Sequence, residues 1–195
     1  MLSYYPPCGN RERGVTLLEV LVTILIVTFG LLGLAGLQAR IQAAELESYQ
    51  RVQAIVLMQE MVDRLRANRH EAVSYVATVG TGSTVTSASS GFQRDLYEWH
   101  NALLGASEIG GAGSPKLGAM KDARGCITNP VTTMPYEFVV AVAWQGLTPT
   151  SAPTASTCGK DQYGANDANR RVVTTRVLFS CLQNSVGTTC ASATP

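Results

Sequence analysis

Hydrophobic residues are spread unevenly along the chain and divide it into two parts. Between Val15 and Leu37 almost every residue is apolar, and Glu19 is the one charged side chain in that run. The run is about 23 residues long, which is enough for a helix to cross a bilayer core of roughly 30 Å. The rest of the chain is more polar and rich in Gly, Ser and Thr. The pattern therefore predicts an apolar N-terminal helix followed by a polar folded body.

The helical pattern continues beyond Leu37, but there it has two different faces. Apolar or small residues recur at steps of three or four, and the predicted stripe is Ile41, Ala44, Ser48, Val52, Ile55, Met58, Val62 and Leu65. This spacing is typical of an amphipathic helix that buries one face. No proline interrupts residues 15–69. We therefore expect one long helix, with a membrane-spanning first half over 15–37 and an amphipathic continuation over 38–79.

Residues 80–195 are expected to form a small globular domain. Alternating apolar residues predict strands over 136–146 and 170–181, and an apolar face predicts a short helix over 92–104. The segment RGCIT at 124–128 adds a short edge strand to this picture. The predicted fold class is α+β, in which the long N-terminal helix packs on a small antiparallel β-sheet.

Charge and motif content argue against several function classes. The formal net charge is +1, and no basic patch points to nucleic acid. The chain has no H-E-x-x-H, no G-x-S-x-G and no carboxylate pair placed for acid–base chemistry. The histidines, His70 and His100, are not grouped with cysteines, and the oxygen-rich segment 160–169 misses the spacing of a calcium loop. We expect no enzymatic activity, no metal ion and no cofactor.

The cysteines indicate disulfide bonds in an oxidising compartment. Cys8 precedes the apolar run, and the polar body contains Cys126, Cys158, Cys181 and Cys190. An even set of cysteines behind a membrane-targeting segment is typical of two disulfides. Four cysteines allow three pairings, between which the sequence does not decide. Because short loops close most readily, we favour Cys126 with Cys158 and Cys181 with Cys190.

Glu19 is the chemically unusual residue of the apolar run. An acid costs about 2.5–3.5 kcal/mol at the centre of a membrane and less near its edge. A cleaved secretory signal would fit a small-x-small site at Gly33 and Ala35, but its apolar core would be only about 7–15 residues long. An ordinary single-pass anchor fits the length and leaves Glu19 as an edge acid that faces lipid headgroups.

The residues around Glu19 resemble the class III signal of type IV pilins and pseudopilins. In that family a hydrophilic leader ends in glycine, and the apolar helix that follows has Glu at its fifth position. Here the leader would be residues 1–14, with the charged run RER before Gly14, and VTLLEVLVTILI follows. The resemblance implies that prepilin peptidase cleaves between Gly14 and Val15 and that the new amine of Val15 is N-methylated. The family usually has Phe where this chain has Val15.

Cleavage after Gly14 would also explain how Glu19 is tolerated. The new positive amine of Val15 would lie four residues before Glu19, which is one helical turn. Inside a helix bundle a paired charge costs much less than an unpaired one. We therefore interpret Glu19 as an assembly charge that docks a subunit where its carboxylate meets an amine, either its own or that of a neighbour.

Three segments of the body extend the resemblance. RGCI, VAVAWQG and RRVVTTRV, with a cysteine-containing loop between the last two, are similar to the PilV family of type IV pilus modification proteins. That family implies an inner-membrane minor pilin with a pilin-like periplasmic domain over 80–195, which later joins the filament and supports adhesion or twitching motility.

The resemblance also implies which partners the chain would meet. These are other minor and major pilins, contacted through the N-terminal helix, and the prepilin peptidase that also methylates. Two alternatives stay open. The chain could be a minor pseudopilin of a type II secretion system, or a membrane-tethered periplasmic binding domain that is never processed.

Overall fold

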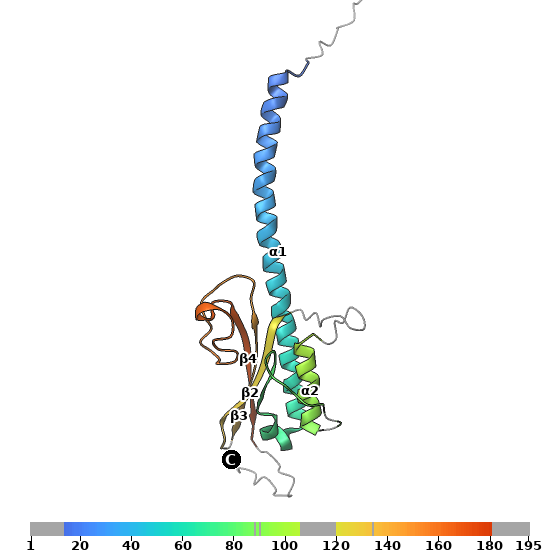
Figure 1. Cartoon of the computed structure of the whole chain (residues 1–195), viewed down its shortest axis with the longest axis vertical. Helices are drawn as coiled ribbons and strands as arrows, with labels where there is room; N and C mark the ends of the chain where they lie inside the picture. The colour runs from blue at the N-terminus through green and yellow to red at the C-terminus, as the bar shows by residue number, and fades with distance from the viewer. Residues whose placement is uncertain (1–13, 88, 90, 106–119, 134, 181–195) are drawn as a thin grey trace, which may run out of the picture. The chain divides into compact units, whose positions relative to one another are not determined.

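We describe a computed structural model of the chain (Figure 1). It describes residues 14–180 apart from 88, 90, 106–119 and 134. The chain forms two compact units, Met1–Ala44 and Glu45–Pro195. Each unit is described by itself below.

The first helix, α1 (Leu17–Ala67), is 51 residues long, which confirms the prediction of one long N-terminal helix. It ends well before residue 79, because the range 38–79 also contains the 3₁₀ helix η1 (Arg69–Tyr75) and the strand β1 (Ala77–Gly80). Asn68 marks the end: its backbone leaves the helical region, and its side-chain amide donates to the hydroxyl of Tyr75 at 2.9 Å. The boundary assigned to the helical continuation was therefore about twelve residues too late.

Within the unit Glu45–Pro195, α1 buries a face that differs in part from the predicted stripe. Its buried residues are Gln50, Ala54, Met58, Met61, Val62 and Leu65. Val52 and Ile55, which were predicted to be buried, are 54% and 43% exposed, and Ser48 is also exposed. The first turns of this part of the helix have apolar residues on more than one face. Spacing alone therefore did not decide which face the sheet would cover.

The remaining strands complete a four-stranded antiparallel sheet with the order β1-β2-β3-β4. They are β2 (Lys121–Val131), β3 (Tyr136–Gln145) and β4 (Arg170–Phe179). β3 and β4 confirm the two predicted strands. The predicted short edge at 124–128 was wrong in both respects, because β2 has 11 residues and lies between β1 and β3. Two register shifts interrupt the alternation of apolar and polar residues in β2. For this reason the sequence pattern did not predict its full length.

The core lies between α1, a second helix and one face of the sheet. Phe138, Val140, Val142 and Trp144 of β3 are buried there, as the alternation predicted. The second helix, α2 (Gly91–Leu103), confirms the predicted short helix and buries Trp99. A side chain at Gly125 of β2 would come within 2.3 Å of the Trp99 ring, so glycine lets α2 approach the sheet closely.

Arg64 connects α1 to α2 through two carboxylates of α2, and it also pairs with Glu60 of its own helix. Its guanidinium donates to Asp95 at 2.9 Å, to Glu98 at 2.7 Å and to Glu60 at 2.6 Å. Arg94 donates to the other oxygen of Glu98 at 2.7 Å. The hydrogen bonds from Arg94 and Arg64 hold the pKa of Glu98 below its usual value. The contact between the two helices is therefore partly electrostatic.

This pKa shift predicts a loss of stability in acid. A carboxyl with a lowered pKa in the folded state stabilises the fold above its unfolded pKa, and that contribution is lost as the pH falls through the folded pKa. We expect the wild type to melt at a higher temperature than Glu98→Gln at pH 7. The difference should shrink below the ordinary glutamate pKa of 4.5. Thermal unfolding between pH 7 and 3 measures it, with Glu45→Gln as the control. A difference that does not change with pH would contradict the prediction.

Candidate processing and assembly site

The bond predicted to be cleaved, Gly14–Val15, lies just before α1. Residues 14–16 are not helical and are exposed, and α1 begins at Leu17. Val15 is 69% exposed, and a side-chain carbon added at Gly14 would meet no atom within 4 Å. A peptide bond ahead of the helix is not held in the helical hydrogen-bond ladder. Both residues that flank the bond are therefore exposed and lie outside the helix.

Thr16 caps the N-terminus of α1. Its hydroxyl accepts the backbone N–H of Glu19 at 3.3 Å, and its carbonyl accepts the N–H of Glu19 at 3.0 Å and of Val20 at 3.2 Å. Thr16 and Glu19 have the T-x-x-E spacing of a capping box, in which the acid lies on the third helical residue. The spacing was visible in the sequence and sequence reasoning missed it. It gives Glu19 a second favourable environment, because a carboxylate is stabilised near a helix N-terminus.

The structure describes the uncleaved chain, in which residue 15 has no free amine. Because α1 begins two residues after Val15, the i,i+4 geometry with Glu19 requires that the helix extend back to residue 15 after cleavage. Glu19 is exposed, and none of the ion pairs formed by the described residues involves it. Its carboxylate is therefore accessible to an amine of its own chain or of another.

The N-terminal part of α1 is apolar and uncovered. α1 is the one helix of the described residues that is long and apolar enough to cross a membrane, with a window of mean hydropathy 2.6 that is 0% buried. Leu17 is 84% exposed and Phe29 71% exposed. So much exposed apolar surface requires lipid or other helices to cover it.

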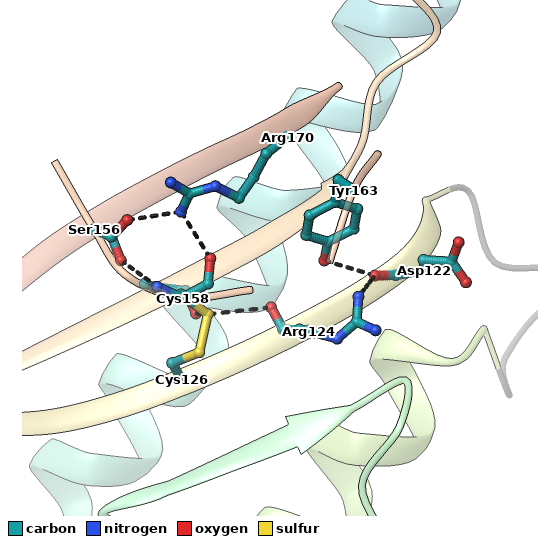
Figure 2. The surroundings of a disulfide bond; sticks show 8 residues. Asp122, Arg124, Cys126, Ser156, Cys158, Tyr163 and Arg170 are labelled. Atoms are coloured by element: carbon teal, nitrogen blue, oxygen red, sulfur yellow. Dashed lines mark hydrogen bonds between the residues drawn. A yellow bond between two sulfur atoms is a disulfide. The ribbon is translucent and has the colours of Figure 1, made fainter. Parts of the chain in front are cut away.

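In the polar body a disulfide joins Cys126 of β2 to Cys158 of the β3–β4 loop, with 5.8 Å between the Cα atoms (Figure 2). This is the first of the two pairs favoured from the sequence. The second pair, Cys181 with Cys190, lies outside the described residues, as does Cys8. The disulfide fixes the long connection between β3 and β4 onto the face of the sheet opposite to the core.

Arg170 holds the same loop from inside (Figure 2). The residue is 3% exposed, and its guanidinium donates to the carbonyls of Ser156 at 2.7 Å and Cys158 at 3.0 Å. It also donates to the carbonyl of Pro153 at 2.7 Å and lies 3.1 Å from a carboxylate oxygen of Asp167. Sequence reasoning did not single out Arg170, and no local motif marks it.

The acidic loop considered for calcium is organised by protein groups. Asp167 pairs with Arg170, and the same carboxylate oxygen accepts the backbone N–H of Asp161 at 2.8 Å. No cluster of candidate metal ligands occurs among the residues that the structure describes. His100 is buried, and its Nδ1 accepts the backbone N–H of Gly80 at 3.0 Å. His70 is exposed on η1.

Removal of the Cys126–Cys158 disulfide is expected to lower the free energy of unfolding by about 3–4 kcal/mol, because the bond closes a loop with a sequence separation of 32. The variant is Cys126→Ser with Cys158→Ser, and denaturant unfolding of the full chain in detergent measures it. Cys8→Ser, within the predicted leader, is the control and should unfold like the wild type. An unchanged unfolding midpoint in the double variant would show that the loop is held without the bond.

Two family models match the N-terminal half of the chain. The prokaryotic N-terminal methylation motif matches residues 9–35, which include Gly14, Val15 and Glu19. The type IV pilin Tt1218 model matches residues 36–94, from the middle of α1 to the start of α2. Searches among curated proteins and among solved structures gave no match to this chain.

These matches agree with the geometry of the site. The methylation motif includes the exposed, non-helical residues 14–16 and the first part of α1. The pilin model covers the part of α1 that packs on the sheet. Neither match distinguishes the PilV family from other pilin-like proteins. Together the two matches support a type IV pilin-like protein, of the kind that prepilin peptidase processes.

Proposed function

We propose that this protein is a minor pilin that primes or joins a type IV pilus. Prepilin peptidase cleaves it between Gly14 and Val15, and Val15 is then N-methylated. The observation that carries the proposal is the coincidence of three features at the start of α1. They are an accessible Gly14–Val15 bond, an exposed acid at Glu19 and an uncovered apolar helix, within a match to the methylation motif.

We further propose that the unprocessed chain crosses the inner membrane once and that residues 80–195 lie in the periplasm. The buried disulfide between Cys126 and Cys158 favours this, because such bonds persist in an oxidising compartment. In the filament the apolar part of α1 would exchange lipid for the helices of other pilins. Each subunit would then meet its neighbours mainly through residues 15–37.

A role as a minor pseudopilin of a type II secretion system is the second candidate. That role requires the same leader, the same acid at Glu19 and the same apolar part of α1. Deletion of the gene separates the two, because loss of pili or twitching supports a pilus role, whereas loss of protein export supports a secretion role.

The N-terminal mass of the protein from its own membrane tests the proposal. We expect a polypeptide that begins at Val15 and carries one methyl group. A working protein that retains residues 1–14 would refute processing and would favour a tethered binding domain.

Replacing Glu19 is expected to separate cleavage from assembly. In Glu19→Ala and Glu19→Gln, cleavage should stay largely intact, because the Gly14–Val15 bond is unchanged. Incorporation into pili should fall, because the amine loses its partner. The measurement is the ratio of this protein to major pilin in sheared filaments.

Thr16→Ala is the matched control for Glu19. It removes the cap of α1, which costs about 0.5–2 kcal/mol of helix stability, and keeps the carboxylate. We expect its incorporation to exceed that of Glu19→Gln. Equal losses in the two variants would assign Glu19 to helix capping and not to charge pairing.

A further inference from the structure

The two edge strands of the sheet, β1 and β4, differ in length and in whether their outward backbone groups are already hydrogen-bonded. The edge strand β1 has only 4 residues. Its Gly80 N–H, which would otherwise point away from the sheet, donates to Nδ1 of His100 on α2 at 3.0 Å in a buried position. A short strand whose outer backbone group is bonded to a helix offers little to another chain. The β1 edge is closed.

The β4 edge is long and regular. β4 pairs with β3 over all 10 residues, from Tyr136 opposite Phe179 to Gln145 opposite Arg170, and no register shift interrupts this ladder. Alternate residues of an antiparallel edge strand turn their N–H and C=O groups outward. Within the described part of the chain, no backbone hydrogen bond from any element other than β3 reaches residues 172–179.

The usual protections of a free edge are also missing from β4. Residues 172–179 contain no proline, no lysine and no bulge. Their one charged side chain is Arg176, and its guanidinium lies 3.0 Å from the carboxylate of Glu137 on β3. Leu178 is 65% exposed. The edge therefore presents β-branched and apolar residues with a locally balanced charge.

We propose that the outer edge of β4, with which no described segment pairs, receives an extended strand from a different chain, which adds a fifth strand to the sheet. Backbone hydrogen bonds along residues 172–179 would supply the recognition. The partner segment would be about eight residues long, uncharged and rich in small or β-branched residues, because Arg176 is already paired with Glu137. The proposal rests on the proposed function, since it assumes neighbouring subunits.

A second copy of this chain fits the edge less well than a different chain. Glu47 of α1 contacts Arg171 at the start of β4 at 2.5 Å, and the part of α1 after residue 45 runs in the same direction as β4 (Figure 1). Antiparallel pairing of two β4 edges about a two-fold axis would reverse one of the two helices. Neighbouring subunits of the proposed filament, whose α1 helices are expected to run in the same direction, cannot both meet that requirement. The other edge of a second copy, β1, is closed.

The test is site-specific photocrosslinking in the native cell with the full chain. A benzophenone side chain replaces Leu178 at the edge, and a second protein carries it at exposed Thr86 as the control. We expect an adduct from position 178, absent from position 86, whose cross-linked peptide is an uncharged segment of a different chain.

Two proline variants, each combined with the label at 178, distinguish strand addition from contact with a face. Thr174→Pro and Thr175→Pro remove adjacent N–H groups, of which one points outward and one toward β3. The variant that loses the outward group should keep the wild-type melting temperature and reduce the adduct about tenfold or more. The other should lower the melting temperature, because it breaks the ladder with β3.

Several outcomes would overturn the proposal. They are an adduct to a second copy, an adduct within the same chain, no adduct at 178, or an adduct that persists in the stably folded proline variant. The N-terminal mass of the same sample distinguishes a failure of strand addition from a failure of the proposed processing. A chain that begins at Val15 without an adduct refutes only strand addition, whereas an intact leader refutes the proposed processing.

Discussion

Gly14→Val is expected to abolish cleavage and to leave the full-length protein in the membrane. A peptidase must bring the carbonyl of residue 14 against its catalytic groups, and a β-branched side chain there both fills space and restricts the backbone. The chain itself should not be disturbed, because Gly14 lies before α1 and an added carbon would meet nothing within 4 Å. Intact mass after membrane extraction measures the effect, and at least a 100-fold loss of processed protein is expected, or about 2.7 kcal/mol in the barrier.

The matched control is Gly14→Ala, which adds one carbon at the same open position. We expect partial cleavage of this variant, so that processing falls in the order Gly, Ala, Val. Equal melting temperatures of the three proteins would show that the fold is unchanged. Complete processing of Gly14→Val would place the cut elsewhere and would remove the basis for pairing Glu19 with an amine of Val15.

Arg170→Met is expected to lower the free energy of unfolding by about 3–5 kcal/mol. Arg170 and Asp167 are buried, at 3% and 4% exposed. Methionine fills similar space but leaves the carboxylate of Asp167 without its cation. It also leaves the carbonyls of Pro153, Ser156 and Cys158 without this donor. Denaturant unfolding of the full chain in detergent measures the loss.

Arg176→Met is the matched control on the same strand. Its ion pair with Glu137 is exposed at the arginine, where 76% of the side chain is accessible, so its loss should cost about 1 kcal/mol or less. The double variant Arg170→Met with Asp167→Leu removes the buried charge altogether and should recover part of the stability. Arg170→Met and Arg176→Met with equal effects would contradict the buried role of Arg170.

The sequence predicted those features that local patterns specify. The uninterrupted helical pattern gave most of α1, and strict alternation gave β3 and β4. The apolar face of Phe92, Leu96, Trp99 and Leu103 predicted α2. The Gly14–Val15–Glu19 spacing, together with the charged leader, carried the resemblance that the family matches support.

The features that were missed depend on contacts between distant residues. β1 is too short to show alternation, and it becomes a strand because β2 lies beside it. The burial of Gln50 and Ala54, with Val52 exposed, depends on where the sheet meets α1. Arg170 follows an ordinary polar segment, and its partners are carbonyls 12 to 17 residues earlier in the chain.

The β3–β4 connection is held in a way that makes it a suitable site for an inserted peptide. Arg170 donates hydrogen bonds to carbonyls of its main chain, and the disulfide fixes it near its middle, at Cys158. The side chains of Ser151, Thr154 and Thr157 face solvent. Because the anchoring uses carbonyls, which every residue possesses, these three positions can be exchanged with little cost to the fold. An epitope tag grafted there would report where the protein sits in an intact filament without touching the helix that assembles it.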